Sequence, residues 1–339
     1  MTPARGRFAA IAATGSALPG RVVPNSFFES LVDTNDEWIV DRTGIRERRF
    51  ADDDETTATL STDAARLALD AAGMSPDQLD LIVVATVTPD RLLPSVAVIV
   101  QDALGVSCPA FDVNAACAGF SYGTSVARAM VESGASDTVL VVGAETLSRR
   151  INMEDRTTCV LFGDGAGAAI FVPSQEPGVM ASNLFADGAA AKLLTIPAGG
   201  TAGPDPDEPP IDTIVMKSGS EVYKRAVVGM TDACRSLLEK SGVAAEDVRW
   251  LIPHQANARI MKTVADRLGF GPDRVISDVE RIGNTSAASV PIALDEAWRD
   301  GRIRRGDLVL MTSFGAGMAW GAAIVKWSAP DLPGAEATA

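Results

Sequence analysis

The sequence is poor in the residues that build metal centres and disulfide frameworks. It contains one histidine and four cysteines, which lie far apart at positions 108, 117, 159 and 234. No two cysteines have the CxxC spacing of a zinc site, and a disulfide framework is unusual in a chain of this size. We therefore expect no metal and no cofactor, and reduced thiols in a cytoplasmic protein.

Long apolar runs are missing as well. No stretch reaches the roughly 18 residues that a membrane-spanning helix needs. The apolar run over 8–13, which follows Arg5 and Arg7, is too short for a usual signal peptide, so we expect it to form the first strand. Positive charge is also scarce, because 30 Lys and Arg against 44 Asp and Glu give a net charge of −14. This balance disfavours nucleic acid and anionic membranes as partners.

Aromatic residues make up only 5% of the chain, whereas glycine and alanine are abundant. Small side chains let helices and backbones pack closely, although a genome biased toward alanine codons explains the same composition. With 339 residues, 47% of them apolar, the chain can bury a large core, in two domains or in one of double size.

Strand and helix patterns alternate along the chain, and one order of elements occurs twice. The first copy predicts helices over 61–72 and 117–133 and strands over 79–87, 110–113 and 138–143. The second predicts helices over 256–268 and 285–300 and strands over 248–252, 275–278, 308–312 and 322–327. A hairpin is expected over 159–172.

Two such halves should bury their sheets against shared helices and hold a site between them, at the carboxyl ends of strands. We place the halves at residues 1–175 and 176–330, with a tail at 331–339. The stretch 199–210 is rich in proline and acidic residues and predicts a surface loop, which is either a lid or inert.

His254 is the only imidazole that the chain can use. It follows the strand over 248–252 directly, where a doubly wound fold places reactive groups, although a structural histidine is the alternative. Cys117 has a comparable place, since a strand ends, a turn of small residues follows, and a helix begins at or near the cysteine. A helix N-terminus stabilises a thiolate, but a cysteine there can also serve packing alone.

Two further segments of the second half complete the candidate site. Asn284 stands at a loop-to-helix junction in GNTSAAS (283–289), where it can cap the helix or point its amide into a cleft. Glycines follow the strand over 308–312, in SFGAGMAWG (313–321). They allow the backbone to approach a ligand closely, and their N–H groups can form an oxyanion hole.

These segments, in this order and spacing, resemble the β-ketoacyl-acyl-carrier-protein synthase III family of the thiolase fold. The resemblance runs from Phe8 to Trp327 and includes TNDEWIVDRTGIR (34–46), FGDGAG (162–167) and PHQAN (253–257). It implies a thiolase-like α/β fold layered α-β-α-β-α and a homodimer. The implied activity is decarboxylative Claisen condensation of an acyl-CoA with malonyl-acyl carrier protein, which initiates fatty acid synthesis.

The same resemblance implies the roles of the site residues. Cys117 takes the acyl group as a thioester, His254 and Asn284 hydrogen-bond the thioester oxygen where enolate charge develops, and residues 162–167 are structural. The N–H groups of Cys117 and Ala316 hold the oxyanion. The residues implied in CoA binding are Thr34, Trp38, Arg42 and Arg156. Leu93 matches a position that lines the acyl pocket of the partner subunit.

The residue types agree with this chemistry on physical grounds. Decarboxylation removes no proton from carbon, so it needs no carboxylate base, only donors aimed at a developing enolate in a dry site. A neutral histidine and an asparagine amide supply two such donors, and a covalent intermediate divides the condensation into two easier steps.

Basic residues near the expected cleft entrance can attract an acidic carrier protein locally, despite the negative net charge. They can equally be ordinary solvated side chains. The docking candidates are Lys224, Arg225, Arg259 and Lys262.

Other members of this fold are disfavoured by the residues present. Chain-elongating condensing enzymes use two histidines, and this chain has one. Thiolases use a second cysteine in the C-terminal glycine loop, and residues 313–321 contain none. Hydroxymethylglutaryl-CoA synthases use a glutamate, and the stretch Ala85–Thr88, where we expect it, has no carboxylate. Two alternatives stay open. One is a related acyltransferase of secondary metabolism, which loads a polyketide starter or acylates oxygen or nitrogen. The other is a non-catalytic partner subunit, against which the intact Cys117, His254 and Asn284 argue.

Overall fold

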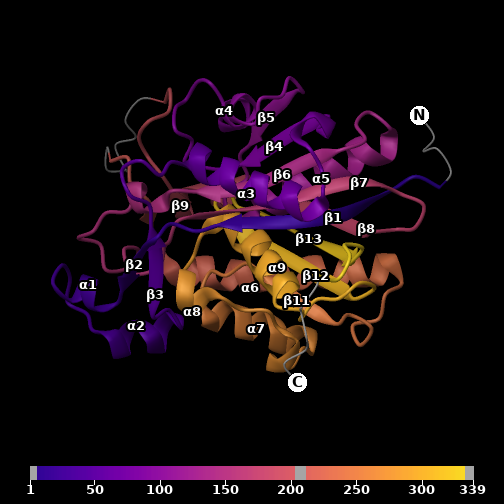
Figure 1. The fold of residues 1–339 in the computed structure, drawn as a ribbon. Helices are drawn as coiled ribbons and strands as arrows, with labels where there is room; N and C mark the ends of the chain where they lie inside the picture. Colours follow the sequence, from indigo (N-terminus) through magenta and orange to yellow (C-terminus); the bar gives the residue numbers. More distant parts are fainter. Residues whose placement is uncertain (1–5, 203–210, 333–339) are drawn as a thin grey trace.

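The computed structural model describes residues 6–202 and 211–332. Most of the predicted acidic loop at 199–210 and most of the tail at 331–339 lie outside these residues. The fold is the predicted layered α/β arrangement, in which two β-sheets alternate with three layers of helices (Figure 1).

The first sheet has five strands, all from the first 174 residues. Their order across the sheet is β1 (Phe8–Ala17), β7 (Gly165–Ser174), β6 (Val139–Glu145), β4 (Leu81–Ala85) and β5 (Ala110–Val113). The strands β4, β5 and β6 are parallel, whereas β1 and β7 run antiparallel to their neighbours. Every residue of β4 and β6 is buried, as β-branched runs between two helix layers require.

The second sheet repeats this order. Its strands are β8 (Val179–Ala186), β13 (Ala319–Lys326), β12 (Leu308–Gly315) and β11 (Trp250–Pro253). The strands β11 and β12 are parallel, and a single parallel bridge from Leu251 to Val275 stands where β5 stands in the first sheet. The expected strand over 275–278 is therefore reduced to this one bridge.

The helices form three layers around the two sheets (Figure 1). The outer layer on the first sheet consists of α3 (Thr57–Ala72) and α4 (Val96–Ala103), and the middle layer of α5 (Gly119–Ser133) and α9 (Ser289–Arg299). The outer layer on the second sheet consists of α6 (Gly219–Ser241) and α7 (Ala258–Leu268). One hydrophobic cluster fills the space around the middle layer, and two others lie under the outer layers.

The small residues of the sequence allow close contact between layers. A Cβ atom on Gly15 of β1 would lie 2.4 Å from the backbone nitrogen of Ala68 in α3, so no larger residue fits there. The helix α3 begins with a capping box between Thr56 and Thr59 and ends at Gly73, which has a φ of 63°. The composition thus reflects how tightly the layers pack.

A separate cap covers one end of the layers (Figure 1). It contains two short helices, α1 (Ser26–Glu29) and α2 (Asp36–Thr43), and a two-stranded sheet of β2 (Arg21–Pro24) and β3 (Glu47–Phe50). The helix α8 (Val279–Ile282) packs on β3. A further pair of strands consists of β9 (Leu194–Thr195) and β10 (Val215–Met216).

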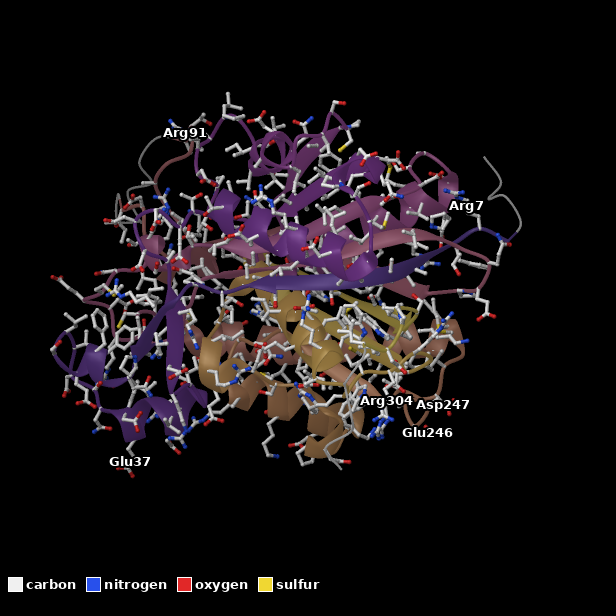
Figure 2. All side chains as sticks on the ribbon, in the orientation of Figure 1. Arg7, Glu37, Arg91, Glu246, Asp247 and Arg304 are labelled. Carbon is white, nitrogen blue, oxygen red and sulfur yellow. The ribbon has the colours of Figure 1, made fainter. Side chains whose placement is uncertain are left out.

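One expectation about the elements is wrong, and one long helix has no counterpart in the prediction. The predicted hairpin over 159–172 does not form, because residues 159–161 are a turn, Phe162 bridges to Asn284, and the strand β7 pairs with β1 and β6 instead. The longest helix of the described chain, α6, was not predicted at all. Charged side chains, such as the labelled Glu37 and Arg304, project from the periphery (Figure 2). Among the described residues, none of the helices combines the length and apolar character that crossing a membrane requires.

Candidate active site

Cys117 lies at the predicted junction between a strand and a helix. The strand β5 ends at Val113, and the cysteine occupies a single turn of 3-10 helix, η2 (Ala116–Ala118), which leads into α5. Ala116 has a φ of 47°, which is rare for a residue with a side chain and makes the turn sharp. The turn presents Cys117 to a cavity of about 610 Å³.

The environment of Cys117 favours the protonated thiol over the thiolate. Burial raises the pKa of Cys117 to about 12; the side chain of Ser286 opposes the rise, and the carboxylate of Glu145 adds to it. The place at the start of α5 is the one predicted, but the expected lowering of the pKa does not follow from it, because desolvation of the anion outweighs the favourable terms. Any reaction in which this sulfur is the nucleophile therefore requires a destination for its proton.

His254 follows β11 directly, as predicted, and is buried. Its backbone N–H donates to the carbonyl of Thr312, and its Nδ1 lies 2.7 Å from the hydroxyl of Ser289. Burial lowers the pKa of His254 to about 3, so the imidazole is neutral at physiological pH. The neighbours of His254 in the motif are structural: Gln255 donates to backbone carbonyls, and Asn257 caps α7 by accepting from Ile260.

Asn284 lies in the loop before α9 and is nearly buried. Its backbone forms a parallel bridge with Phe162, with hydrogen bonds to Leu161 and Gly163. Its side-chain oxygen accepts the N–H of Ser286 at 2.9 Å, which leaves the amide nitrogen as a donor for a ligand. Asn284 thus precedes α9, but its side chain does not cap the first turn of that helix.

The glycine loop after β12 approaches Cys117 closely. A Cβ atom on Gly315 would lie 2.5 Å from the backbone nitrogen of Cys117, so only glycine leaves that N–H accessible. Ala316 and Gly317 line the same cavity as Cys117. The two backbone segments that the sequence predicted as an oxyanion hole are therefore neighbours.

The loop over 284–289 connects these groups. Ser286 in the 3-10 turn η6 (Ser286–Ala288) lines the cavity beside Cys117, and Ser289 contacts the imidazole of His254. His254 and Asn284 are not among the residues that line the cavity. Asn284 is hydrogen-bonded to Ser286, which does line the cavity, and His254 contacts Ser289, three residues further along the same loop.

Comparison with known proteins agrees with this geometry. Two family models match, the 3-oxoacyl-[acyl-carrier-protein] synthase III model over residues 111–188 and the C-terminal model of the same synthase over residues 238–327. The β-ketoacyl-[acyl-carrier-protein] synthase III of Erythrobacter litoralis is 48% identical over 94% of this chain and 99% of its own length. That of Thiobacillus denitrificans is also 48% identical, over 94% of this chain and 99% of its own.

The chain belongs to the β-ketoacyl-[acyl-carrier-protein] synthase III family.

Solved structures support the same assignment. The synthase III of Thermus thermophilus superposes with a TM-score of 0.90 at 44% identity and covers 94% of this chain and 99% of its own. The priming β-ketosynthase of the R1128 polyketide pathway has a TM-score of 0.90 at 38% identity, over 97% of this chain and 99% of its own. The thiolase-like fold that the sequence predicted is therefore confirmed.

Of the residues predicted to bind CoA, two arginines lie over one aromatic ring of the cap helix α2. The guanidinium groups of Arg42 and Arg156 lie 5.3 and 4.9 Å from the ring centre of Trp38. The hydroxyl of Thr34 is buried without a hydrogen-bond partner. Three of the four predicted residues thus meet at one aromatic ring, and the fourth has an unused polar atom; their role in binding CoA stays a prediction.

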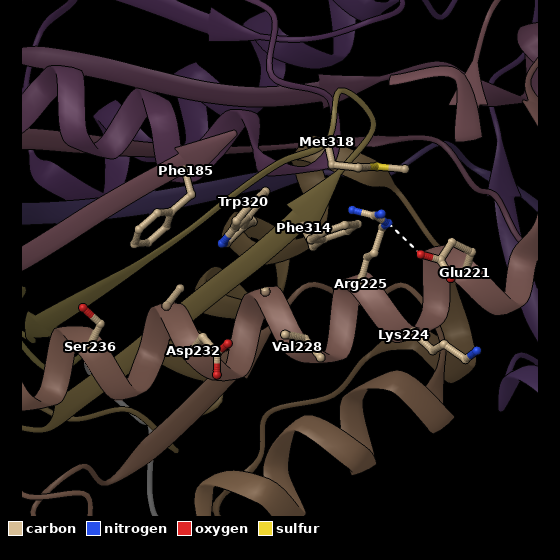
Figure 3. Close-up of a pocket in the computed structure, with 12 residues that line it drawn as sticks. Phe185, Glu221, Lys224, Arg225, Val228, Asp232, Ser236, Phe314, Met318 and Trp320 are labelled. Carbon is tan, nitrogen blue, oxygen red and sulfur yellow. Dashed lines mark hydrogen bonds and ion pairs between the residues drawn. The ribbon is translucent and has the colours of Figure 1, made fainter. Parts of the chain in front are cut away.

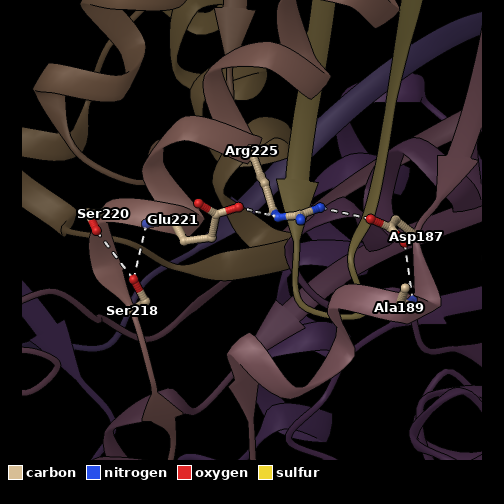
Figure 4. A network of polar contacts seen from close by, with 6 residues as sticks. All are labelled: Asp187, Ala189, Ser218, Ser220, Glu221 and Arg225. Carbon is tan, nitrogen blue, oxygen red and sulfur yellow. Dashed lines mark hydrogen bonds and ion pairs between the residues drawn. The ribbon is translucent and has the colours of Figure 1, made fainter.

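The predicted docking residues lie on α6 and α7, but most of their charges are already paired. Arg225 bridges Glu221 and Asp187 at 2.8 Å each (Figure 4). Arg259 contacts Asp41 at 3.2 Å, and Lys262 contacts Asp266 at 2.6 Å. This pairing weakens the local positive field, so docking at these residues stays a prediction.

Lys224 and Arg225 also border a second pocket, of about 460 Å³, which lies between α6 and the strands β8, β12 and β13 of the second sheet (Figure 3). Its aromatic residues Phe185, Phe314 and Trp320 stack on one another. This pocket shares none of its described lining residues with the Cys117 cavity. Leu93 is 84% exposed in the single chain and does not line the Cys117 cavity, whereas its neighbour Leu92 does.

Three residues of the site escaped the sequence prediction, namely Glu145, Ser286 and Ser289. Glu145 ends β6, and its buried carboxylate accepts hydrogen bonds from Thr86, Val87 and Thr88. The stretch Ala85–Thr88 has no carboxylate of its own, as the sequence showed. The fold nevertheless places the carboxylate of Glu145 against this stretch. Among the described residues, no three histidine, cysteine or acidic side chains meet in a way that could hold a metal ion.

Proposed function

We propose that this chain catalyses the decarboxylative condensation of an acyl-CoA with malonyl-acyl carrier protein, which initiates fatty acid synthesis. The single observation that carries the proposal is the 48% identity over 94% of the chain to proteins named β-ketoacyl-[acyl-carrier-protein] synthase III. The cavity with Cys117, Ser286 and Ala316 on its wall supports it.

In the first half-reaction, Cys117 attacks the thioester carbonyl of the acyl-CoA. The N–H groups of Cys117 and Ala316 stabilise the oxyanion of the tetrahedral intermediate, and CoA leaves as a thiol. The CoA adenine binds at Trp38, Arg42, Arg156 and Thr34. This assignment rests on the clustering of three of these side chains at one ring.

In the second half-reaction, malonyl-acyl carrier protein loses CO2, and the enolate carbon attacks the acyl-Cys117 thioester. The neutral imidazole of His254 and the amide of Asn284 donate hydrogen bonds to the enolate oxygen. A neutral His254 suits this role because it donates without competing as an acid, and its pKa of about 3 keeps it neutral.

The enzyme works on acyl-CoA and an acyl carrier protein, the latter docking near Lys224, Arg225, Arg259 and Lys262. We further propose a cytoplasmic homodimer, in which Leu93 of each subunit contributes to the acyl pocket of the other. The halves divide at residue 175, between the last strand of the first sheet and the first strand of the second. Acyl transfer to oxygen or nitrogen is not favoured, because curated relatives at 48% and 49% identity are named β-ketoacyl-[acyl-carrier-protein] synthase III.

The experiment follows a radiolabelled acetyl group. Wild-type protein incubated with labelled acetyl-CoA should carry the label on Cys117, and Cys117→Ala should carry none. Added malonyl-acyl carrier protein should then release CO2 and labelled 3-oxobutanoyl-acyl carrier protein. Asn284→Ala should accept the label but lose most of the CO2 release. A wild-type protein that accepts no label from any acyl-CoA contradicts the proposal.

A further inference from the structure

The hydroxyl of Ser286 stands between the sulfur of Cys117 and the carboxylate of Glu145. Its Oγ donates to Oε1 of Glu145 at 3.0 Å, and the same side chain interacts with the Cys117 thiol. Ser286 and Cys117 line one cavity, whereas Glu145 lies fully buried behind them. The three side chains come from three separate elements, η2, η6 and the end of β6.

Packing holds this arrangement in place. A Cβ atom on Gly143 of β6 would lie 2.2 Å from the carbonyl oxygen of Ala287, and one on Gly119 would lie 3.3 Å from the Cβ of Ala287. The turn η6 is thus pressed between β6 and the start of α5. Ser286 itself has a φ of 51°, which aims its side chain into this junction.

Glu145 is a buried carboxylate without a basic partner among the described residues. Its Oε2 accepts from the hydroxyls of Thr86 and Thr88 and from the N–H groups of Val87 and Thr88. Its Oε1 faces Ser286. The one titratable group that interacts with it, within the described chain, is Cys117. Burial raises the pKa of Glu145 to about 7, against these hydrogen bonds, so the group can exchange a proton near neutral pH.

The positions of the available protons decide which group donates at each contact from Cys117 through Ser286 to Glu145. Ser286 has one hydroxyl proton, and it points at the carboxylate of Glu145. In this orientation its oxygen offers lone pairs to a protonated thiol, whereas toward the thiolate the same hydroxyl is a donor, which is how Ser286 lowers the pKa of Cys117. Ser286 therefore stands between the nucleophile and a base, hydrogen-bonded to the base and in interaction with the sulfur.

We propose that Glu145 receives the thiol proton of Cys117 through the hydroxyl of Ser286 during acylation. This inference rests on the proposed condensing activity. As sulfur attacks the acyl carbon, its proton moves to the Ser286 oxygen, and the hydroxyl proton of Ser286 moves to Glu145. When the tetrahedral intermediate collapses, the carbon–sulfur bond to CoA breaks. The two protons then shift back, so that the departing CoA thiolate is protonated and Glu145 is ionised again.

Ser286 touches the reacting sulfur, and Glu145 acts through Ser286 as a positioning residue. The relay also explains why a carboxylate is tolerated so close to a sulfur that must become anionic. An ionised Glu145 opposes the thiolate, but a Glu145 that has just taken the proton is neutral. Release of CO2 from malonyl-acyl carrier protein, by contrast, moves no proton of Cys117, because the sulfur is still acylated when CO2 leaves. The Cys117 thiolate that condensation expels afterwards takes up a proton from solvent, in a step that follows CO2 release.

The test separates the two half-reactions in Ser286→Ala and Glu145→Gln. Ser61→Ala is the matched control, because it removes a buried hydroxyl that bonds only to a carbonyl within α3. The first readout is the burst of CoA released from acetyl-CoA as a function of pH. The second is CO2 release from malonyl-acyl carrier protein by enzyme that has first been acylated to completion by long incubation at alkaline pH.

We expect acylation at neutral pH to fall on the order of 100-fold in both variants, the usual contribution of a positioned base. The wild-type acylation rate should rise with pH through the ionisation of Glu145, and this step should vanish from both variants. The first-turnover release of CO2 by the acylated enzyme should stay close to the wild-type rate. Ser61→Ala should match the wild type in both half-reactions.

Two results would overturn the relay alone. One is acylation in Ser286→Ala with the wild-type rate and pH profile. The other is an equal loss of acylation and condensation in Glu145→Gln, which would indicate a purely structural role. A wild-type enzyme that never acylates Cys117 overturns the proposed function itself, and the relay with it.

Discussion

Replacing Glu145 by glutamine should remove the part of the pH dependence of the free energy of unfolding that comes from this carboxyl group. The glutamine has the same shape and keeps an oxygen for the hydroxyl and N–H groups of the 86–88 stretch, but it does not titrate. In the wild type, burial raises the pKa of Glu145 from 4.5 to about 7. Between these values the native state holds a proton that the unfolded chain has released. Stability from this group is therefore present below pH 4.5 and is lost as the pH rises through 7.

The magnitude follows from the size of the shift. A change of about 2.5 pKa units corresponds to about 3 kcal/mol, of which measurements at about pH 5 and pH 8 include about 2.5 kcal/mol. The assay is equilibrium urea unfolding of both proteins at each pH, at one protein concentration. The free energy of unfolding of the wild type, minus that of Glu145→Gln, should fall by this amount from pH 5 to pH 8.

Taking the difference between the two proteins removes other pH effects. His254, whose pKa of about 3 makes the native state lose stability as the pH falls below 6.5, contributes equally to both. Any pH-independent cost of the amide also cancels when the two pH values are compared. A difference that does not change with pH, or that grows as the pH rises, would refute the raised pKa of Glu145.

Three further predictions concern single positions. Gly315→Ala should lower the acylation rate about 10²–10³-fold, because its Cβ would lie 2.5 Å from the backbone nitrogen of Cys117 and displace an oxyanion donor. Burst kinetics measure this rate. The control is Gly188→Ala, whose added Cβ atom meets nothing within 4 Å. Asn257→Ala should lower the free energy of unfolding by about 1 kcal/mol through loss of the α7 cap and leave acylation unchanged, which urea unfolding and the burst assay determine. Trp38→Ala should raise KM for acyl-CoA about 10-fold with little change in kcat, as expected for loss of a stacked base; steady-state kinetics would contradict this if kcat fell instead.

The elements that sequence alone predicted best are those with one dominant pattern. The strand at 110–113 was predicted with its observed bounds, and α3 ends at Ala72 before Gly73, as expected. Each is determined by local features, namely apolar runs and a glycine able to adopt a positive φ. The helix α6 had a comparable signal, since Ala226, Met230, Ala233 and Leu237 form a buried stripe at helical spacing. This helix lies between the two copies of the repeated order of elements, so the repeat does not predict it.

Contacts between distant segments explain what the sequence could not reveal. Nothing near position 145 indicates that its carboxylate meets the 86–88 stretch, because that contact depends on the pairing of β4 with β6. Ser286 and Ser289 belong to the motif GNTSAAS (283–289). Only the folded structure, in which η6 packs against η2, shows that Ser286 interacts with Cys117 and that Ser289 contacts His254. The residue types in the sequence were enough to predict the chemistry, whereas the supporting residues could be found only from contacts in the folded structure.

The two halves use equivalent places of the fold for different tasks. Thr86 follows β4 as His254 follows β11, and the sharp turns at Ala116 and Ser286, with φ of 47° and 51°, each open a helix of the middle layer. Because the halves face each other, the turn with the nucleophile in one half contacts the turn with a hydroxyl in the other. The first half then provides the sulfur and, beside it, the carboxylate; the second provides the imidazole, the amide and the hydroxyl between them. Under the proposed roles, each half-reaction therefore draws on residues of both halves.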